Sequence, residues 1–366
     1  MNKLRKAFSF SRLLFLLLCS VFLIITFILN NIASAIIEKQ DTQQAATRWK
    51  KEGGAAQISC FFSVNTKLTP ESIEDFEHNL DSALEAASIV LESPHANARL
   101  WADAYSASGK IAIKSNIGKI DVDAIGIGGD FFLFHPLPLL SGSYFSGNDI
   151  MQDYCVLDQD AAWKLFGSNN VVGQTVYIGE VAHIVTGVVK RDESKLYKAA
   201  GLDSALIYVS YSTLEKYGSN NGINHFEIVM PNPVKGYAYD YVKKAIGVAE
   251  EELEIVENSK RFTFFNRIKH IAKLQNRAMN GKAIIYPYWE NVARVTEDKL
   301  ARLMILQLLF TAISVIVISI SLFILWKNKK CTVKSVLIRL KEWMELKIIK
   351  RNQQRMYEKQ KKQRKA

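Results

Sequence analysis

The chain has 366 residues and a net charge of +11, but this charge is unevenly distributed. Residues 1–12 carry four Lys or Arg, and residues 327–366 carry fifteen against three Glu, so the rest of the chain has a net charge of −5. Because the positive charge belongs to the two ends, it does not indicate a basic globular domain that binds nucleic acid.

Two apolar segments lie near the ends of the chain, at residues 13–37 and 303–326. The second has no charged residue, and a helix of that length, about 36 Å, exceeds a hydrocarbon core of about 30 Å. Both segments are predicted to span a membrane as helices. For the first, a cleaved signal peptide is the alternative, because residues 33–35 read Ala-Ser-Ala, but the apolar run is longer than the usual 7–15 residues of a signal core.

The basic ends predict the topology. Lys and Arg next to membrane spans stay on the cytoplasmic side, so residues 1–12 and 327–366 are both expected inside the cell. Residues 38–302 then form an extracytoplasmic domain in a two-span protein of the cell membrane.

Between the spans, the first half of the chain predicts a helical stalk, a buried strand and an amphipathic helix that Thr69 caps and that begins at Pro70. A hairpin is expected across Ser108-Gly109. The segments, in order, are a stalk at 38–52, a strand at 57–64, a helix from 70, hairpin strands at 99–106 and 110–115, a strand at 119–127 and an irregular stretch at 131–145.

The second half predicts a helix that Asp158 caps and Gly167 ends in a left-handed conformation. A long final helix is expected from Thr296 through residue 326. The segments, in order, are a strand at 154–157, a helix at 159–166, strands at 174–178, 182–190, 204–210 and 224–230, a helix at 237–247, a strand at 253–257 and a helix at 262–279.

The most specific stretch is residues 139–194, which contains SGSYF, AAWKLFG, VGQTV and VTGVV in this order. Together these pieces resemble the MacB-like periplasmic core domain of ABC transporter permeases in the MacB/FtsX group. None of the residue types in these pieces is catalytic, so we expect them to define a fold. These structural positions are Gly142, Tyr144, Phe145, Ala161, Leu165, Phe166, Gly167, Gly173 and Gly187.

The resemblance implies an α+β fold, with a mixed α/β extracytoplasmic domain in two parts between the transmembrane helices. One part would be residues 57–160 and the other a smaller β-rich insert at about 161–217. Typical members have four spans, whereas two are predicted here, so we expect a shortened permease that lacks the last two transmembrane helices.

The function implied is that of a permease-like or accessory membrane subunit of an ABC transporter. Its outer domain would be coupled to a separate ABC ATPase, and to other membrane subunits, by conformational change. The alternative is a stand-alone membrane-anchored protein that binds or scaffolds an extracytoplasmic partner. The sequence does not distinguish a homo-oligomer from a hetero-oligomer.

No catalytic, cofactor-binding or metal site is predicted. The six histidines are scattered without HExxH spacing, and no CxxC, GxSxG or Walker A motif is present. His135 and His183 are therefore expected to be packed or exposed rather than ligands. Cys60 and Cys155 could form a disulfide, or could be two buried thiols.

Residues 333–348 predict a basic amphipathic helix directly after the second span. Its apolar face would lie on the inner leaflet or dock on a cytoplasmic partner, or the segment could be a solvated tail. The expected contacts to membrane lipid or partner come from Lys334, Arg339, Lys341 and Lys347. No nucleic-acid partner is expected for a segment tied to the membrane.

Overall fold

The computed structural model describes residues 2–90, 98–273, 282–328 and 342–347. The chain divides into two compact units, one made of residues 1–29 and 306–366 and the other of residues 30–305. Helices α1 (Asn2–Glu38) and α10 (Tyr288–Asn328) each contribute to both units.

In the first unit, α1 packs against α10. The rings of Phe22 and Phe310 are stacked with their centroids 5.6 Å apart, and the Cys19 thiol donates to the Ser314 carbonyl at 3.8 Å. Residues 17–38 and 288–324 are long and apolar enough to cross a membrane. These two helices and the mixed domain between them confirm the predicted α+β, two-span membrane protein.

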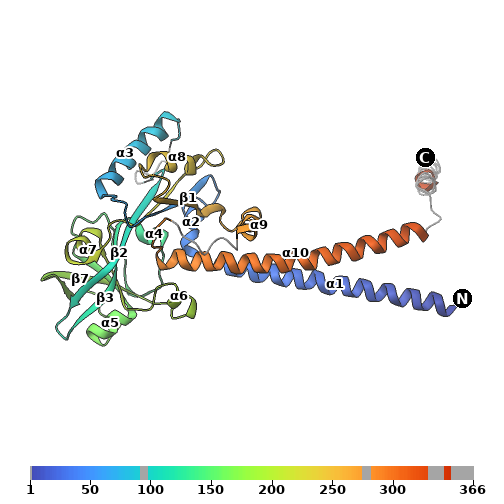
Figure 1. Cartoon of the computed structure of the whole chain (residues 1–366), viewed down its shortest axis with the longest axis horizontal. Helices are drawn as coiled ribbons and strands as arrows, with labels where there is room; N and C mark the ends of the chain where they lie inside the picture. The colour runs from blue at the N-terminus through green and yellow to red at the C-terminus, as the bar shows by residue number, and fades with distance from the viewer. Residues whose placement is uncertain (1, 91–97, 274–281, 329–341, 348–366) are drawn as a thin grey trace, which may run out of the picture. The chain divides into compact units, whose positions relative to one another are not determined.

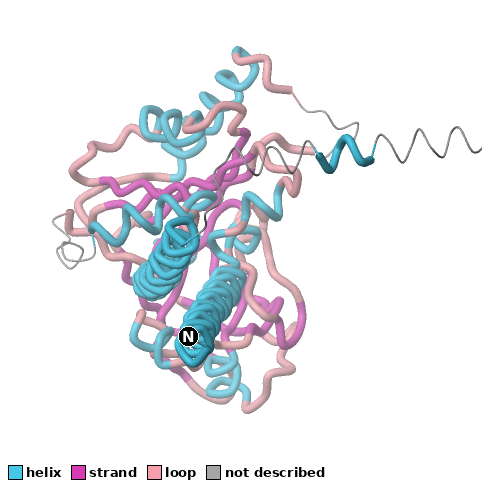
Figure 2. The backbone as a smooth tube through the Cα atoms, turned by 90° about the vertical axis from the view of Figure 1, so that its right-hand side faces the viewer, coloured by secondary structure: helices cyan, strands magenta, loops and turns pink. Residues whose placement is uncertain are grey.

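The second unit is built on one mixed sheet of eleven strands (Figure 2). Its main path runs β11-β1-β10-β2-β3-β8-β5-β7-β4, with β6 paired to β2 and β7, and β9 paired to β2. The strands are β1 (Ala55–Phe62), β2 (Ala102–Lys114), β3 (Lys119–Gly129), β4 (Leu139–Gly142), β5 (Tyr154–Asp158), β6 (Thr175–Ile178), β7 (Val181–Val189), β8 (Leu206–Ser210), β9 (Ser219–Asn220), β10 (His225–Pro231) and β11 (Leu253–Glu257).

Helices cover both faces of this sheet. One core lies under α3 (Pro70–Ala86), α5 (Gln159–Phe166), α7 (Tyr211–Tyr217) and α8 (Tyr237–Ala245). Figure 1 shows α3 and α8 near β1, and α5 and α7 near β2 and β3. The second core packs α2 (Ala45–Trp49), α4 (Phe131–Phe134) and Trp289 of α10 against the other face.

The alternation of side-chain directions along β10 explains how this one strand contributes residues to both cores. Successive side chains of a strand point to opposite faces, so Phe226, Ile228 and Met230 enter the first core. Val229 enters the second core, and His225 and Glu227 share its face of the sheet. One face of β10 is therefore entirely apolar, whereas the other carries two buried ionisable groups.

Several local predictions are confirmed. The Thr69 hydroxyl accepts from the Ser72 amide at the start of α3, and the Asp158 carboxylate accepts from the Ala161 amide at the start of α5. Gly167 ends α5 with φ +67°, in the left-handed region that favours glycine.

The predicted hairpin at Ser108-Gly109 is wrong, because β2 runs straight through both residues. A Cβ on Gly109 would lie 2.3 Å from the Ser219 carbonyl oxygen. The glycine is needed for the close approach of β9, not for a turn.

Three further expectations are corrected. The long helix begins at Tyr288, not at Thr296, and Thr296 lies buried two turns inside it. The stalk at 38–52 is not one helix, since α1 ends at Glu38 and η1 (Asp41–Gln43) and α2 follow. The stretch 131–145 contains α4 and β4 on either side of its prolines, because Pro136 and Pro138 exclude regular structure only locally.

The predicted helix at 262–279 corresponds to α9 (Phe264–Lys273), and its remainder lies outside the described residues. The residues of the predicted insert, 161–217, contribute β6, β7 and β8 to the same sheet as the rest of the domain. The boundary of a separate insert thus stays a prediction.

Candidate functional site

The candidate site is a buried polar network around the root of α10, which we define as residues 288–298. The helix begins directly after Pro287, whose carbonyl accepts from the amides of Glu290 and Asn291. Nothing in residues 288–295 interrupts a helix, and the burial of Trp289, Val292 and Ala293 stabilises these turns inside the domain. Packing, rather than a capping residue, decides where this helix starts.

Arg261 holds the root of α10 through ion pairs with two glutamates. Its guanidinium donates to both Glu290 carboxylate oxygens, at 2.7 and 2.8 Å, and to Glu297 at 2.8 Å. Arg294 adds a bond to Glu290 at 2.8 Å. Burial lowers the pKa of Arg261, but the two facing carboxylates outweigh this and raise it above its usual value. Because Arg261 binds both oxygens of Glu290, the ion pair also fixes the relative orientation of the two side chains. We call these ion pairs of Arg261 the joint at the root of α10.

The network continues from Arg261 to the sheet. The guanidinium donates to the Asn258 side-chain oxygen at 3.2 Å, and the Asn258 amide donates to the Ser59 hydroxyl at 2.6 Å. Ser59, on β1, donates in turn to Glu227 on β10 at 2.5 Å. A chain of hydrogen bonds thus joins the root of α10 to the centre of the domain.

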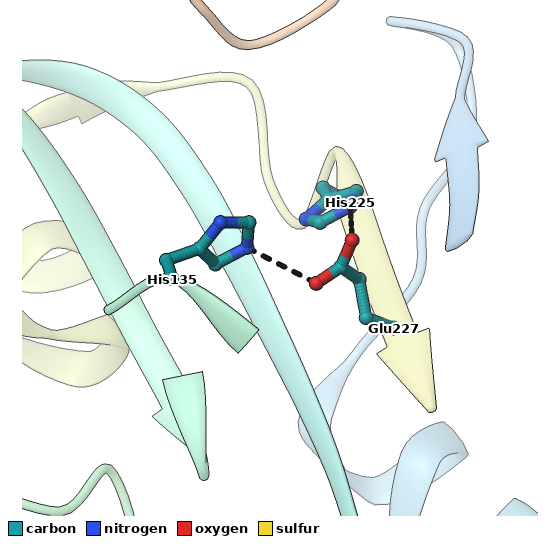
Figure 3. A group of neighbouring side chains, drawn as sticks. All are labelled: His135, His225 and Glu227. Carbon is teal, nitrogen blue, oxygen red and sulfur yellow. Dashed lines mark ion pairs between the residues drawn. The ribbon is translucent and has the colours of Figure 1, made fainter. Parts of the chain in front are cut away.

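Two histidines face Glu227 at the inner end of the network (Figure 3). The Nε2 atom of His135 lies 3.1 Å from one carboxylate oxygen, and the Nε2 atom of His225 lies 3.2 Å from the other. All three side chains are at most 3% exposed. We call these three residues the His–His–Glu cluster.

The electrostatics of the cluster follow from its burial. Burial lowers the pKa of His135, against the opposing effect of the Glu227 charge. Burial tends to raise the pKa of Glu227, but the charges and hydrogen bonds of the two neighbouring imidazoles outweigh it and lower this pKa below its usual value. In both groups, burial opposes the charged form and the charge of the partners favours it.

Aromatic rings enclose the cluster. Trp289 of α10 lies with its ring centroid 4.4 Å from that of His135, Phe131 lies 4.5 Å from the same imidazole, and Phe61 stacks on His225 at 4.8 Å. The first turn of α10 thus contacts the cluster directly through Trp289. A shift of α10 along its axis would disturb both the rings and the ion network.

A cleft of about 900 Å³ lies beside the root of α10. Its lining includes Lys39 after α1, Asp158 at the end of β5, and Tyr288 and Thr296 of α10. Burial raises the pKa of Asp158 to about 6, although Arg191 at 3.7 Å acts in the opposite direction.

The structural positions predicted from the sequence lie elsewhere, around β4, α5 and β7. Gly142 pairs with Gly187, and its φ of +74° places a Cβ only 2.1 Å from the Thr186 carbonyl oxygen. Tyr144 stacks on Phe132 at 4.3 Å, and Phe145 contacts the same ring edge-on at 5.9 Å.

The remaining structural positions lie in and after α5. Ala161 and Leu165 are buried, Phe166 is half-buried, and Gly173 has a φ of +80° in open space. The structural positions lie in strands, in core packing or in turns, and their role in defining the family's fold stays a prediction.

The predicted basic surface is described only at Lys347, whose ammonium lies 4.7 Å from the centre of the Trp343 ring. Lys334, Arg339 and Lys341 lie outside the described residues. Cys60 and Cys155 are both free and buried. Five strand spacings separate β1 from β5 in the sheet, about 24 Å, which is too far for a disulfide.

Sequence reasoning missed the network because its members are far apart in the chain. His135 and His225 are 90 positions apart, and Arg261 and Glu290 are joined only by folding. One local signal was available: His225 and Glu227 are two positions apart in a predicted strand, which places both on one face.

The family model and the similar sequences point to the same protein family. The family model for the MacB-like periplasmic core domain matches residues 16–238, more than half of the chain. The macrolide export ATP-binding/permease protein MacB of Chromobacterium violaceum is 33% identical over 132 residues, which cover 35% of this chain and 20% of that protein. MacB of Pasteurella multocida is 27% identical over 158 residues, 43% of this chain and 23% of that protein. The matches span about a fifth of the length of these relatives.

Among solved structures, the periplasmic region of MacB from Actinobacillus actinomycetemcomitans aligns with 64% of this chain and 97% of its own length, at 16% identity and a TM-score of 0.38. The extracellular domain of the transporter YknZ from Gram-positive bacteria aligns with 55% of this chain and 99% of its own length, at 16% identity and a TM-score of 0.34.

Proposed function

Because this chain belongs to the family of the MacB-like periplasmic core domain, found in ABC transporter permeases, we propose that it is a permease-like or accessory membrane subunit of an ABC transporter. In this proposal an ATPase outside these 366 residues hydrolyses ATP, and α10 passes the resulting movement to the extracytoplasmic domain. The domain itself transmits conformational change and performs no chemistry.

The observation that carries the proposal is the joint at the root of α10. A 41-residue helix, about 60 Å long, begins among buried ion pairs and continues into an apolar segment that can cross a membrane. A helix held by a bidentate, buried ion pair cannot slide or rotate without breaking directional bonds. Movement imposed on the membrane part of α10 would therefore reach β1 and β10 through Arg261, Asn258 and Ser59.

The topology is part of the proposal. Both basic ends would be cytoplasmic and the domain extracytoplasmic. A cysteine at the fully exposed position of Ile150 should react with a membrane-impermeant maleimide in intact cells. A cysteine in place of Lys347 should react only after the membrane is permeabilised.

Affinity capture of the full chain from its own membranes in mild detergent tests the function. The proposal expects an ABC ATPase to copurify in a fixed ratio and to remain bound at moderate salt. A monodisperse chain without a nucleotide-binding partner would instead support the stand-alone binding or scaffolding protein. The same preparation would identify bound lipid, the contacts of the basic tail, and whether the chain forms a homo-oligomer or a hetero-oligomer.

A further inference from the structure

We propose that the His–His–Glu cluster binds a divalent transition-metal ion, with Zn²⁺ as the metal that best suits its donors. The ligands would be the Nε2 atoms of His135 and His225 and a carboxylate oxygen of Glu227. The geometry that supports this site does not rest on the proposed transport function, and the site was not expected from the sequence.

The geometry of the three ligand atoms fits a small cation. They all lie within 4.8 Å of one another. The Nε2 atom of His135 lies 3.1 Å from Glu227 Oε2, and the Nε2 atom of His225 lies 3.2 Å from the other carboxylate oxygen, Oε1. Two ligands of a tetrahedral Zn²⁺ at about 2.0–2.1 Å are roughly 3.3 Å apart. Small rotations of the imidazoles would therefore bring all three ligands to bonding distance.

The same atoms lack hydrogen bonds. His135 Nε2, His225 Nε2 and Glu227 Oε2 are buried, and none has a partner at hydrogen-bonding angles among the described residues, although they are close to one another. A buried polar atom without a partner costs about 1–3 kcal/mol. A cation between these atoms would satisfy all three at once.

Neighbouring polar groups hold two of the ligands in place. The second oxygen of Glu227 accepts from Ser59, which itself accepts from Asn258. The Nδ1 atom of His225 lies 3.4 Å from the Ser106 hydroxyl. Such outer partners orient the ligands of protein metal sites and strengthen them.

The chemical class of the ion follows from the donors and their surroundings. Two imidazoles and a carboxylate suit Zn²⁺ and its first-row neighbours, whereas Ca²⁺ and Mg²⁺ prefer oxygen ligands only. Trp289, Phe61 and Phe131 line the cluster, and a water would supply the fourth ligand of a tetrahedral ion. The competing account is a metal-free network in which protonated imidazoles of His135 and His225 balance the charge of Glu227.

The test uses the full chain, purified in detergent with a tag that contains no histidine and stripped with EDTA. Zn²⁺ is titrated by calorimetry, and bound metal is counted by mass spectrometry after desalting. We expect about one Zn²⁺ per chain. His135→Ala and Glu227→Gln should each weaken binding at least a hundredfold. His183→Gln is the matched control, because His183 is also buried but lies outside the cluster, and it should bind like wild type.

A second readout does not depend on whether the variants fold. Co²⁺ added to the wild-type chain should give the intense visible bands of a tetrahedral site with nitrogen and oxygen ligands, without thiolate charge transfer, and Zn²⁺ should displace them. The inference is overturned if wild type binds well under one Zn²⁺ per chain. It is also overturned if folded variants of the cluster bind as wild type does, or if the Co²⁺ spectrum shows thiolate or octahedral coordination.

Discussion

Replacement of Arg261 by Met should weaken the attachment of the root of α10 to the rest of the domain and lower the domain's stability. Arg261 and Glu290 are both nearly fully buried, with 3% and 2% of their side chains exposed, and share two short charge-assisted bonds. Removing one partner of a buried ion pair costs about 3–5 kcal/mol, because the remaining charge stays in a low-dielectric environment. For a domain of this size, that corresponds to a drop in Tm of about 6–20 °C.

Arg294→Met is the matched control. Arg294 also donates to Glu290, but its side chain is 23% exposed, so we expect a loss of only about 1 kcal/mol. The double variant Arg261→Met with Glu290→Leu removes both charges of the buried pair and should recover part of the loss, because an apolar pair can replace a buried ion pair. The recovery is incomplete because Glu297 and Arg294 each lose a partner.

Urea unfolding of the full chain in detergent, followed by tryptophan fluorescence, measures these differences. If Arg261→Met costs no more than Arg294→Met, the ion network does not hold the root of α10 and the proposed joint is refuted. A double variant as unstable as Arg261→Met would show that packing around the guanidinium, not charge, is responsible.

Three further predictions concern the rest of the domain. Gly142→Ala should lower the free energy of unfolding in urea by about 3 kcal/mol or more, because its Cβ would lie 2.1 Å from a carbonyl oxygen. Gly167→Ala, in open space, should lower it by about 1–2 kcal/mol. Equal losses would contradict the packing role of Gly142. The pKa of Asp158 is about 6 in the folded protein and about 3.9 in the unfolded chain, so the folded state holds this proton more tightly. The protonated carboxyl therefore stabilises the folded state below pH 4, and this contribution is lost as the pH rises through 6. Asp158→Asn keeps a cap and should remove about 2–3 kcal/mol of this pH dependence, and an unchanged unfolding profile from pH 4 to 7 would exclude the shift. Cys60 and Cys155 should react with maleimide only after unfolding, without any reductant; a requirement for reductant would demonstrate a disulfide.

Local chemistry in the sequence predicted much of the fold. The Thr69 cap of α3, the Asp158 cap and Gly167 end of α5, and the strand β10 each depend on residues close together in the chain. Periodicity and capping act over a few residues, so their signals are visible without the rest of the molecule.

The features that the sequence did not reveal depend on distant contacts. Gly109 is read locally as a turn residue, but it lies in β2 because β9 approaches it closely. The start of α10 is decided by the burial of Trp289 and by the ion pair of Glu290 with Arg261, not by a cap at Thr296. The candidate site arises from the same long-range pairing, which is why spacing along the chain did not reveal it.

Hydrogen–deuterium exchange on the full chain with its captured ATPase, in nanodiscs with ATP or ADP, tests the central claim most directly. The account predicts that ATP changes exchange at the root of α10 and in β1 and β10. Val295→Pro removes an α10 backbone hydrogen bond within the root of α10, ahead of the apolar segment. It should abolish the ATP-dependent change in β1 and β10, whereas Val295→Ala should preserve it. An ATP response in the domain that survives Val295→Pro unchanged would contradict transmission through α10.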